Sequence, residues 1–146
     1  MSRSIKRELV FPHPREEVWQ AIVNSDTLAE WMYPNDFEAR VGHHFKFQVP
    51  PNPKAKFDGI TIHCEVLECD PPHQLIYAWA GGALLDTRVT FRLEPDGEGT
   101  RLFFEHAGFD FTQPYCEPAV KGLEFGYKKI FEQFQIVMQR LTTRHN

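Results

Sequence analysis

The sequence predicts an α+β fold in which one curved antiparallel sheet wraps around a long C-terminal helix. Residues 117–143 carry apolar side chains at steps of three and four, which is the spacing of one helix face. Much of the preceding chain alternates apolar and polar residues with the period of two that strands show. A helix of about 25 residues is roughly 38 Å long. In a chain of 146 residues, only one curved sheet can cover its apolar face, and such a closure tends to leave a cavity.

One strand and two short helices are expected before the main part of the sheet. Residues 2–11 alternate weakly, which favours a first strand. Pro14 suits the first turn of a helix that continues to Val23, because its missing N–H leaves no unpaired donor there. Residues 24–26 break that helix and supply the N-cap of a second one over residues 28–32.

Six further strands are expected between the second helix and the C-terminal helix. Each shows period-two alternation or a β-rich composition, and turns rich in glycine or proline separate them. Their ranges are 37–41, 43–49, 60–66, 74–80, 85–94 and 100–107.

The last two of these strands form the clearest hairpin in the sequence. The turn between them contains Pro-Asp-Gly-Glu-Gly. If Glu94 faces Arg101 across it as an ion pair, Phe91 faces Phe104 on the opposite surface of the hairpin. His106 then shares the apolar face with Phe104. In the other strand, Leu85 and the alternate residues after it are expected to point the same way.

Composition and charge narrow the classes of function. The net charge is −4 with acids and bases interspersed, which argues against a nucleic-acid partner, since that needs a clustered basic face. No stretch approaches the roughly 18 apolar residues of a membrane span, and the N-terminus lacks the apolar core of a signal peptide. We therefore expect one cytoplasmic domain over residues 1–146, with 13 Phe, 4 Tyr and 3 Trp for a dense core or a lined pocket.

Neither a metal site nor a cofactor is indicated. Cys64 and Cys69 lie five residues apart on one predicted strand, so they point to opposite faces and cannot form a disulfide. Cys116 is expected in a loop, and all three cysteines are expected to be reduced thiols. His43 and His44 are adjacent on a predicted strand and face opposite sides, which prevents them from acting as a metal pair.

Several short motifs occur in a fixed order through nearly the whole chain. They are PREEVW at 14–19, VG at 41–42, DPPHQLIYAW at 70–79, GTRL at 99–102, HAGF at 106–109 and GY at 126–127. With the order of elements, they resemble the helix-grip fold of the START-related, Bet v 1-like superfamily (SRPBCC). Within it, the chain is most similar to the activator-of-HSP-ninety-ATPase homologue domain family.

The resemblance implies a cavity between the sheet and the last helix that takes a lipophilic small molecule, such as a lipid or an aromatic or polyketide-like compound. The family commonly has Gly-Trp where this chain has Gly126-Tyr127, and a second glycine where it has His43. Both differences bring a polar group near the expected pocket wall.

Three functions stay open at this point. The first is non-catalytic binding of the small molecule, and the second is a cyclase or aromatase activity in the same cavity. The third, least favoured, is an interaction module that stimulates a chaperone ATPase, because the chain lacks the additional N-terminal domain of such co-chaperones. An edge strand would allow two copies to pair as a homodimer, and nothing in the sequence demonstrates one.

The candidate ligand-binding residues are aromatic, with one histidine. Each aromatic residue can also be explained as ordinary core packing. Tyr127 and Trp79 are the strongest candidates, because each carries a polar tip that needs a partner when buried. His106 is a weak candidate for catalysis as an acid or base, and otherwise a structural histidine bonded to backbone. The full set is Trp31, Phe45, Phe47, Trp79, Phe104, His106, Phe109, Phe111, Tyr127 and Phe131.

Overall fold

The computed structural model describes residues 4–144, so residues 2 and 3 of the predicted first strand lie outside the described residues. Within these described residues, six strands, two short helices, one 3-10 turn and one long helix follow each other. They are β1 (Ile5–Phe11), α1 (Arg15–Val23), α2 (Ser25–Trp31), β2 (His44–Val49), η1 (Pro53–Ala55), β3 (Ile60–Asp70), β4 (Gln74–Gly81), β5 (Leu84–Asp96), β6 (Gly99–Ala107) and α3 (Cys116–Arg144).

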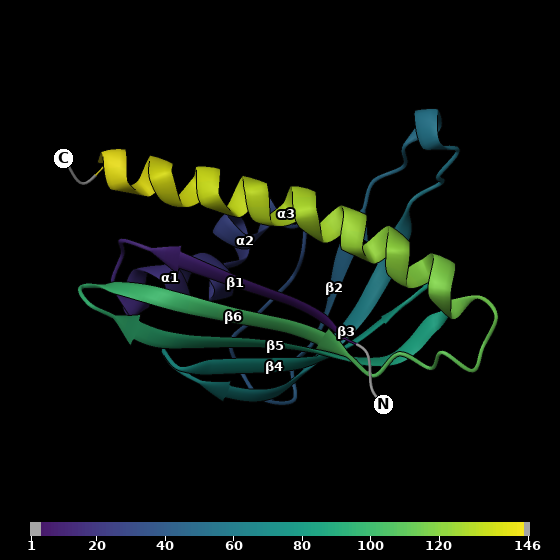
Figure 1. Cartoon of the computed structure of the whole chain (residues 1–146), viewed down its shortest axis with the longest axis horizontal. Helices are drawn as coiled ribbons and strands as arrows, with labels where there is room; N and C mark the ends of the chain where they lie inside the picture. Colours follow the sequence, from purple (N-terminus) through teal and green to yellow (C-terminus); the bar gives the residue numbers. More distant parts are fainter. Residues whose placement is uncertain (1–3, 145–146) are drawn as a thin grey trace.

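The strands form one antiparallel sheet in the order β1-β6-β5-β4-β3-β2. Figure 1 shows α3 running along the sheet, with α1 toward one end, α2 nearer the middle of α3, and the loop that carries η1 projecting at the other end. The inward-facing residues of the strands and one stripe of α3 form a single buried apolar cluster. This arrangement is the helix-grip fold that the sequence predicts.

Local side-chain bonds fix the two short helices. The Asn24 side chain accepts a hydrogen bond from the Thr27 backbone N–H at 3.0 Å and caps α2, within the segment 24–26 where the N-cap is predicted. Pro14 stands at the N-cap of α1 rather than inside its first turn. The buried Trp31 indole N–H donates to the Ala21 carbonyl at 2.9 Å and so ties α2 to α1.

The predicted strand over residues 37–41 is wrong, because this segment forms bends and turns. Side chains take the bonds that a strand ladder would need. The Asn35 side chain accepts from the Phe37 N–H at 3.0 Å, and the Asp36 carboxylate accepts from the Lys46 N–H at 2.7 Å. Asn and Asp often offer the backbone such an alternative to a strand, and the next strand, β2, begins at His44.

The hairpin of β5 and β6 has the predicted register, with Glu94 opposite Arg101, Phe91 opposite Phe104 and Val89 opposite His106. The predicted ion pair between Glu94 and Arg101 is wrong. Arg101 instead bonds Glu8 at 2.7 Å and Asp96 at 3.0 Å, because β1 lies beside β6 and brings Glu8 within reach.

Two further expectations fail near the ends of elements. Leu85 points outward and is 74% exposed, whereas Leu84 is buried. The reason is a bulge: between the pairs Trp79–Thr87 and Gly81–Leu84, β5 advances three residues while β4 advances two. Cys116 is the first residue of α3 rather than part of a loop, and it is buried.

Candidate ligand-binding cavity

A cavity of about 850 Å³ lies between α3 and the sheet. Its wall consists mainly of apolar side chains. They come from the end of α2, the inner faces of β2, β3 and β4, the β4–β5 turn, and the first half of α3 from Ala119 to Ile130. The opposite half of the space under α3 is filled, with Phe134 packed on Trp31 at 4.2 Å and on Phe11 at 5.2 Å between ring centroids.

Two glycines of α3 form part of the cavity wall. Gly122 and Gly126 are one helical turn apart, and both line the cavity. A Cβ atom added at either position would meet no other atom within 4 Å. Glycine inside a helix costs about 1 kcal/mol relative to alanine, so these positions leave open a space that a larger side chain would occupy.

The segment after β2 forms one edge of the cavity. Pro50, Pro51 and Asn52 line it together with Phe57. Asn52 and Phe57 exchange two backbone hydrogen bonds of 2.7 and 3.0 Å, which close the loop around η1. Phe57 of this loop and Phe125 of α3 are 37% and 64% exposed although both line the cavity. These two rings therefore mark where the cavity meets solvent.

A chain of four polar groups lies beside the inner part of the wall. Tyr127 Oη is 2.9 Å from His106 Nδ1, His106 Nε2 is 2.8 Å from Thr87 Oγ1, and Thr87 donates to the Trp79 carbonyl at 2.7 Å. The side chains of Tyr127, His106 and Thr87 are all buried. Trp79 and Tyr127 both line the cavity, so this series of hydrogen bonds connects two residues of the cavity wall.

Burial keeps the hydrogen-bonded side chains of His106 and Tyr127 uncharged near neutral pH. Desolvation lowers the pKa of His106 to about 3, so the imidazole is neutral. Desolvation also raises the pKa of Tyr127 well above its usual value of 10.0, so the phenol keeps its proton. The imidazole lies between the rings of Trp79 and Phe109, with ring centroids 4.7 and 4.8 Å away.

The candidate residues from the sequence divide into those on the wall and those away from it. Phe47, Trp79 and Tyr127 line the cavity, and His106 is bonded directly to Tyr127. The other candidates lie elsewhere in the buried apolar cluster or packed against it; they are Trp31, Phe45, Phe104, Phe109, Phe111 and Phe131.

The comparisons with known proteins agree with this architecture. The profile of the family described as Activator of Hsp90 ATPase homolog 1-like protein matches residues 12–139. This chain belongs to that family. A search of curated proteins finds no match.

Solved structures share the fold of this family member over almost its whole length. Protein MLL2253 from Mesorhizobium loti is 31% identical with a TM-score of 0.80, and the alignment covers 94% of this chain and 98% of that one. Protein BH1534 from Bacillus halodurans is 26% identical with a TM-score of 0.72, covering 94% and 99%. CalU16 from Micromonospora echinospora is 23% identical with a TM-score of 0.74, covering 98% and 80%, and shows likeness of fold alone.

Several wall residues of this family member were not singled out from the sequence. Tyr33 follows α2 and carries a phenol on the wall, where burial raises its pKa. Gly122 is another, and Gly126 enters the sequence motifs only as part of the GY motif. Their spacing of four residues places both on one side of α3, and glycine is unfavourable inside a helix, so the pair is a readable signal for a site where the helix backbone is left uncovered. Tyr33 carries no comparable signal, because it lies just beyond a helix end.

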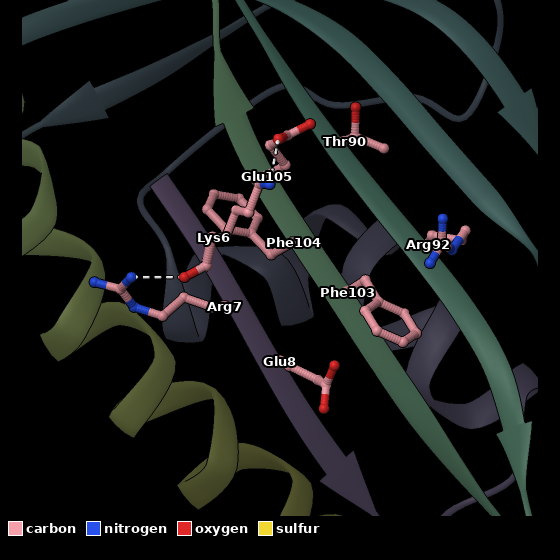
Figure 2. Close-up of a pocket in the computed structure, with 8 residues that line it drawn as sticks. All are labelled: Lys6, Arg7, Glu8, Thr90, Arg92, Phe103, Phe104 and Glu105. Atoms are coloured by element: carbon pink, nitrogen blue, oxygen red, sulfur yellow. Dashed lines mark hydrogen bonds and ion pairs between the residues drawn. The ribbon is translucent and has the colours of Figure 1, made fainter. Parts of the chain in front are cut away.

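A second hollow, of about 390 Å³, lies on the outer face of the sheet across β1, β6 and β5 (Figure 2). Its charged side chains pair with opposite charges or lie against an aromatic ring. Lys6 and Glu105 are 3.8 Å apart, and the Arg92 guanidinium lies 4.5 Å from the Phe103 ring centroid. Arg92 also pairs with Glu94 at 3.4 Å. This is the exposed lattice of charges that an outer sheet face commonly carries, so the inner cavity is the better candidate site.

Within residues 4–144, no group of three or more His, Cys, Asp or Glu side chains could hold a metal ion. In the same part of the chain, every helix is too short or too polar to cross a membrane.

Proposed function

We propose that this protein binds a lipophilic small molecule, such as a lipid or an aromatic or polyketide-like compound, in the cavity under α3, without transforming it. The observation that carries the proposal is a mainly apolar cavity of about 850 Å³ that two helix glycines leave open. Pockets for small ligands commonly measure about 300–1,000 Å³ and are lined by apolar and aromatic side chains with a few polar groups.

Burial of apolar ligand surface would supply most of the affinity. A ligand that hides about 300 Å² of apolar area gains roughly 7 kcal/mol at about 25 cal/mol per Å², before the cost of its lost freedom. The polar tips on the wall, among them Tyr127 and Trp79, would then fix its orientation.

The hydrogen bonds and the burial of His106 favour binding over catalysis. A general acid or base near neutral pH needs a pKa near 7 and a free nitrogen or oxygen close to the substrate. His106 has both ring nitrogens engaged, and its pKa is lowered to about 3 by burial. A cyclase or aromatase that relies on His106 for proton transfer is therefore the less supported alternative.

The first test uses Gly126→Leu, which adds a side chain into the cavity. The matched control is Gln133→Leu, which adds the same side chain at an exposed position of α3. Binding of the uncharged dye N-phenyl-1-naphthylamine is followed by fluorescence. We expect the dye to bind the wild type and the control alike, and Gly126→Leu to weaken binding at least tenfold while thermal stability is kept. Equal binding by all three proteins would place the dye outside the cavity.

The second test looks for a natural ligand. Protein purified without detergent is measured by native mass spectrometry and again after denaturation. We expect a reproducible mass excess that disappears on denaturation and is reduced in Gly126→Leu. A mass excess of the same size in Gly126→Leu would contradict binding in this cavity.

A further inference from the structure

The series of hydrogen bonds that runs from Tyr127 through His106 and Thr87 to the Trp79 carbonyl has only one consistent arrangement of protons. A carbonyl accepts and cannot donate, so the Thr87 hydroxyl, with its single proton, must donate to it. Its oxygen, 2.8 Å from His106 Nε2, is then available only as an acceptor. Nε2 must therefore carry the proton of the imidazole.

The same argument continues to Tyr127. A neutral imidazole with its proton on Nε2 has a bare lone pair on Nδ1. Nδ1 lies 2.9 Å from the Tyr127 oxygen, so the phenol donates its proton to His106. That phenol has one proton, and this bond uses it. The only capacity left on the oxygen is to accept.

The phenol oxygen lies beside the part of the cavity wall that Trp79 forms. It bonds the imidazole on which Trp79 packs, with 4.7 Å between ring centroids. Tyr127 and Trp79 both belong to the cavity wall. Where the phenol oxygen borders the cavity beside these two side chains, a ligand would meet an oxygen that cannot donate.

We propose that Thr87 and His106 are positioning residues that make Tyr127 a pure hydrogen-bond acceptor, so that the cavity selects lipophilic molecules carrying a hydroxyl or N–H group at this point. The inference rests on the proposed function, since it concerns which ligands the same cavity prefers. A carbonyl or ether placed there would face a lone pair, and an unpaired buried polar group lowers affinity.

Other wall residues can donate, so the test has to change the polarity of Tyr127 alone. Tyr33 and Trp79 each carry one donor on the wall. Thr87→Val keeps the shape of residue 87 and removes the acceptor of the Nε2 proton. That proton is then better placed on Nδ1, where it donates to Tyr127, and the phenol O–H becomes free to point into the cavity. Thr87→Ser keeps the hydroxyl and is the matched control.

The probes are three pyrenes, followed by fluorescence titration: 1-hydroxypyrene, the similarly shaped 1-methylpyrene, and pyrene-1-carbaldehyde, which only accepts. For the wild type and Thr87→Ser we expect the hydroxyl compound to bind about fivefold more tightly than the methyl compound, the size of one net hydrogen bond. In Thr87→Val that preference should disappear and the aldehyde should gain about fivefold. Tyr127→Phe should remove both preferences and still bind 1-methylpyrene.

The outcomes separate this inference from the proposed function. If no pyrene binds the wild type, or if binding survives Gly126→Leu, the proposed function fails. If the pyrenes bind in the cavity and the wild type shows no hydroxyl preference, or Thr87→Val keeps it, the inference alone fails. The tautomer is checked without any variant by ¹⁵N NMR of the wild-type imidazole, where we expect a proton on Nε2 and none on Nδ1. The opposite tautomer would overturn the inference.

Discussion

His106 combines complete burial with two hydrogen bonds to the neutral side chains of Tyr127 and Thr87. A buried imidazole of this kind is stabilised only while it stays uncharged. As the pH falls, His106 should therefore be protonated in the unfolded protein well before it is protonated in the folded protein. Stability then depends on pH through this one residue.

We predict that His106 makes the protein less stable as the pH falls below 6.5. Burial lowers the folded-state pKa of His106 from 6.5 to about 3. Between these values the unfolded state binds more protons than the folded state, so the free energy of unfolding falls by about 1.4 kcal/mol per pH unit. The contribution is complete above pH 6.5 and declines steadily as the pH approaches 3.

The measurement is urea unfolding of the wild type and of His106→Gln at pH 7 and pH 5. The variant lacks this titration, so the stability difference between the two proteins should shrink by about 2 kcal/mol over that interval. Other titrating groups cancel in the comparison. Parallel losses in both proteins would mean that His106 accepts a proton in the folded state.

Part of this polar chain could be read from the sequence. The predicted hairpin register places His106 opposite Val89, and Thr87 lies two residues away on the same face, so their contact follows from alternation. The bond to Tyr127 does not follow from it. That bond depends on how far α3 is rotated and shifted over the sheet, which helix periodicity alone does not fix.

At the scale of elements, the glycines of α3 differ in kind from the glycines of the strands and turns. Gly122 and Gly126 have helical backbones beside open space. Gly99, at the start of β6, packs so closely that an added Cβ would collide with the Phe11 carbonyl. Gly122 and Gly126 therefore have room for a methyl group, and Gly99 has none.

We predict that Gly122→Ala and Gly126→Ala each raise the free energy of unfolding by about 0.5–1 kcal/mol, the helix-propensity difference between the two residues. Gly99→Ala is the contrasting variant and should lower it by roughly 1–3 kcal/mol through the forced backbone shift. Chemical denaturation of the three variants measures these changes. Destabilisation by the helix substitutions would show that side chains occupy the space beside α3.

The one strand that the sequence overpredicts shows the limit of pattern reading at this scale. Residues 37–41 precede Gly42 and an aromatic strand, and from the sequence they are predicted to form a strand themselves. Asn35 and Asp36 lie just before this segment. Their side chains accept hydrogen bonds from the backbone N–H groups of Phe37 and Lys46 instead. Such a local competition depends on geometry, and composition does not reveal which arrangement wins.

At the scale of the whole molecule, the space between α3 and the sheet has a filled half and an open half. Helix periodicity and strand alternation predicted the sheet around the helix, because the long apolar stripe of α3 has no other cover in this chain. They did not predict which half is filled. That depends on where Trp31 and Phe11 lie along the helix, and both pack against Phe134.

This division predicts opposite outcomes for two truncations on α3. Phe134 is fully buried among aromatic rings, and Phe134→Ala should cost about 3–5 kcal/mol of stability, as large-to-small core substitutions do. Leu123 is only partly buried, packs against the edge of the core and lines the cavity, so Leu123→Ala should cost about 1 kcal/mol, because much of its side chain has no packed neighbours to lose. Urea unfolding and dye titration of both variants test this. We expect Leu123→Ala to change dye affinity more than stability, and a stability loss as large as that of Phe134→Ala would show that the cavity is closed by packing around Leu123.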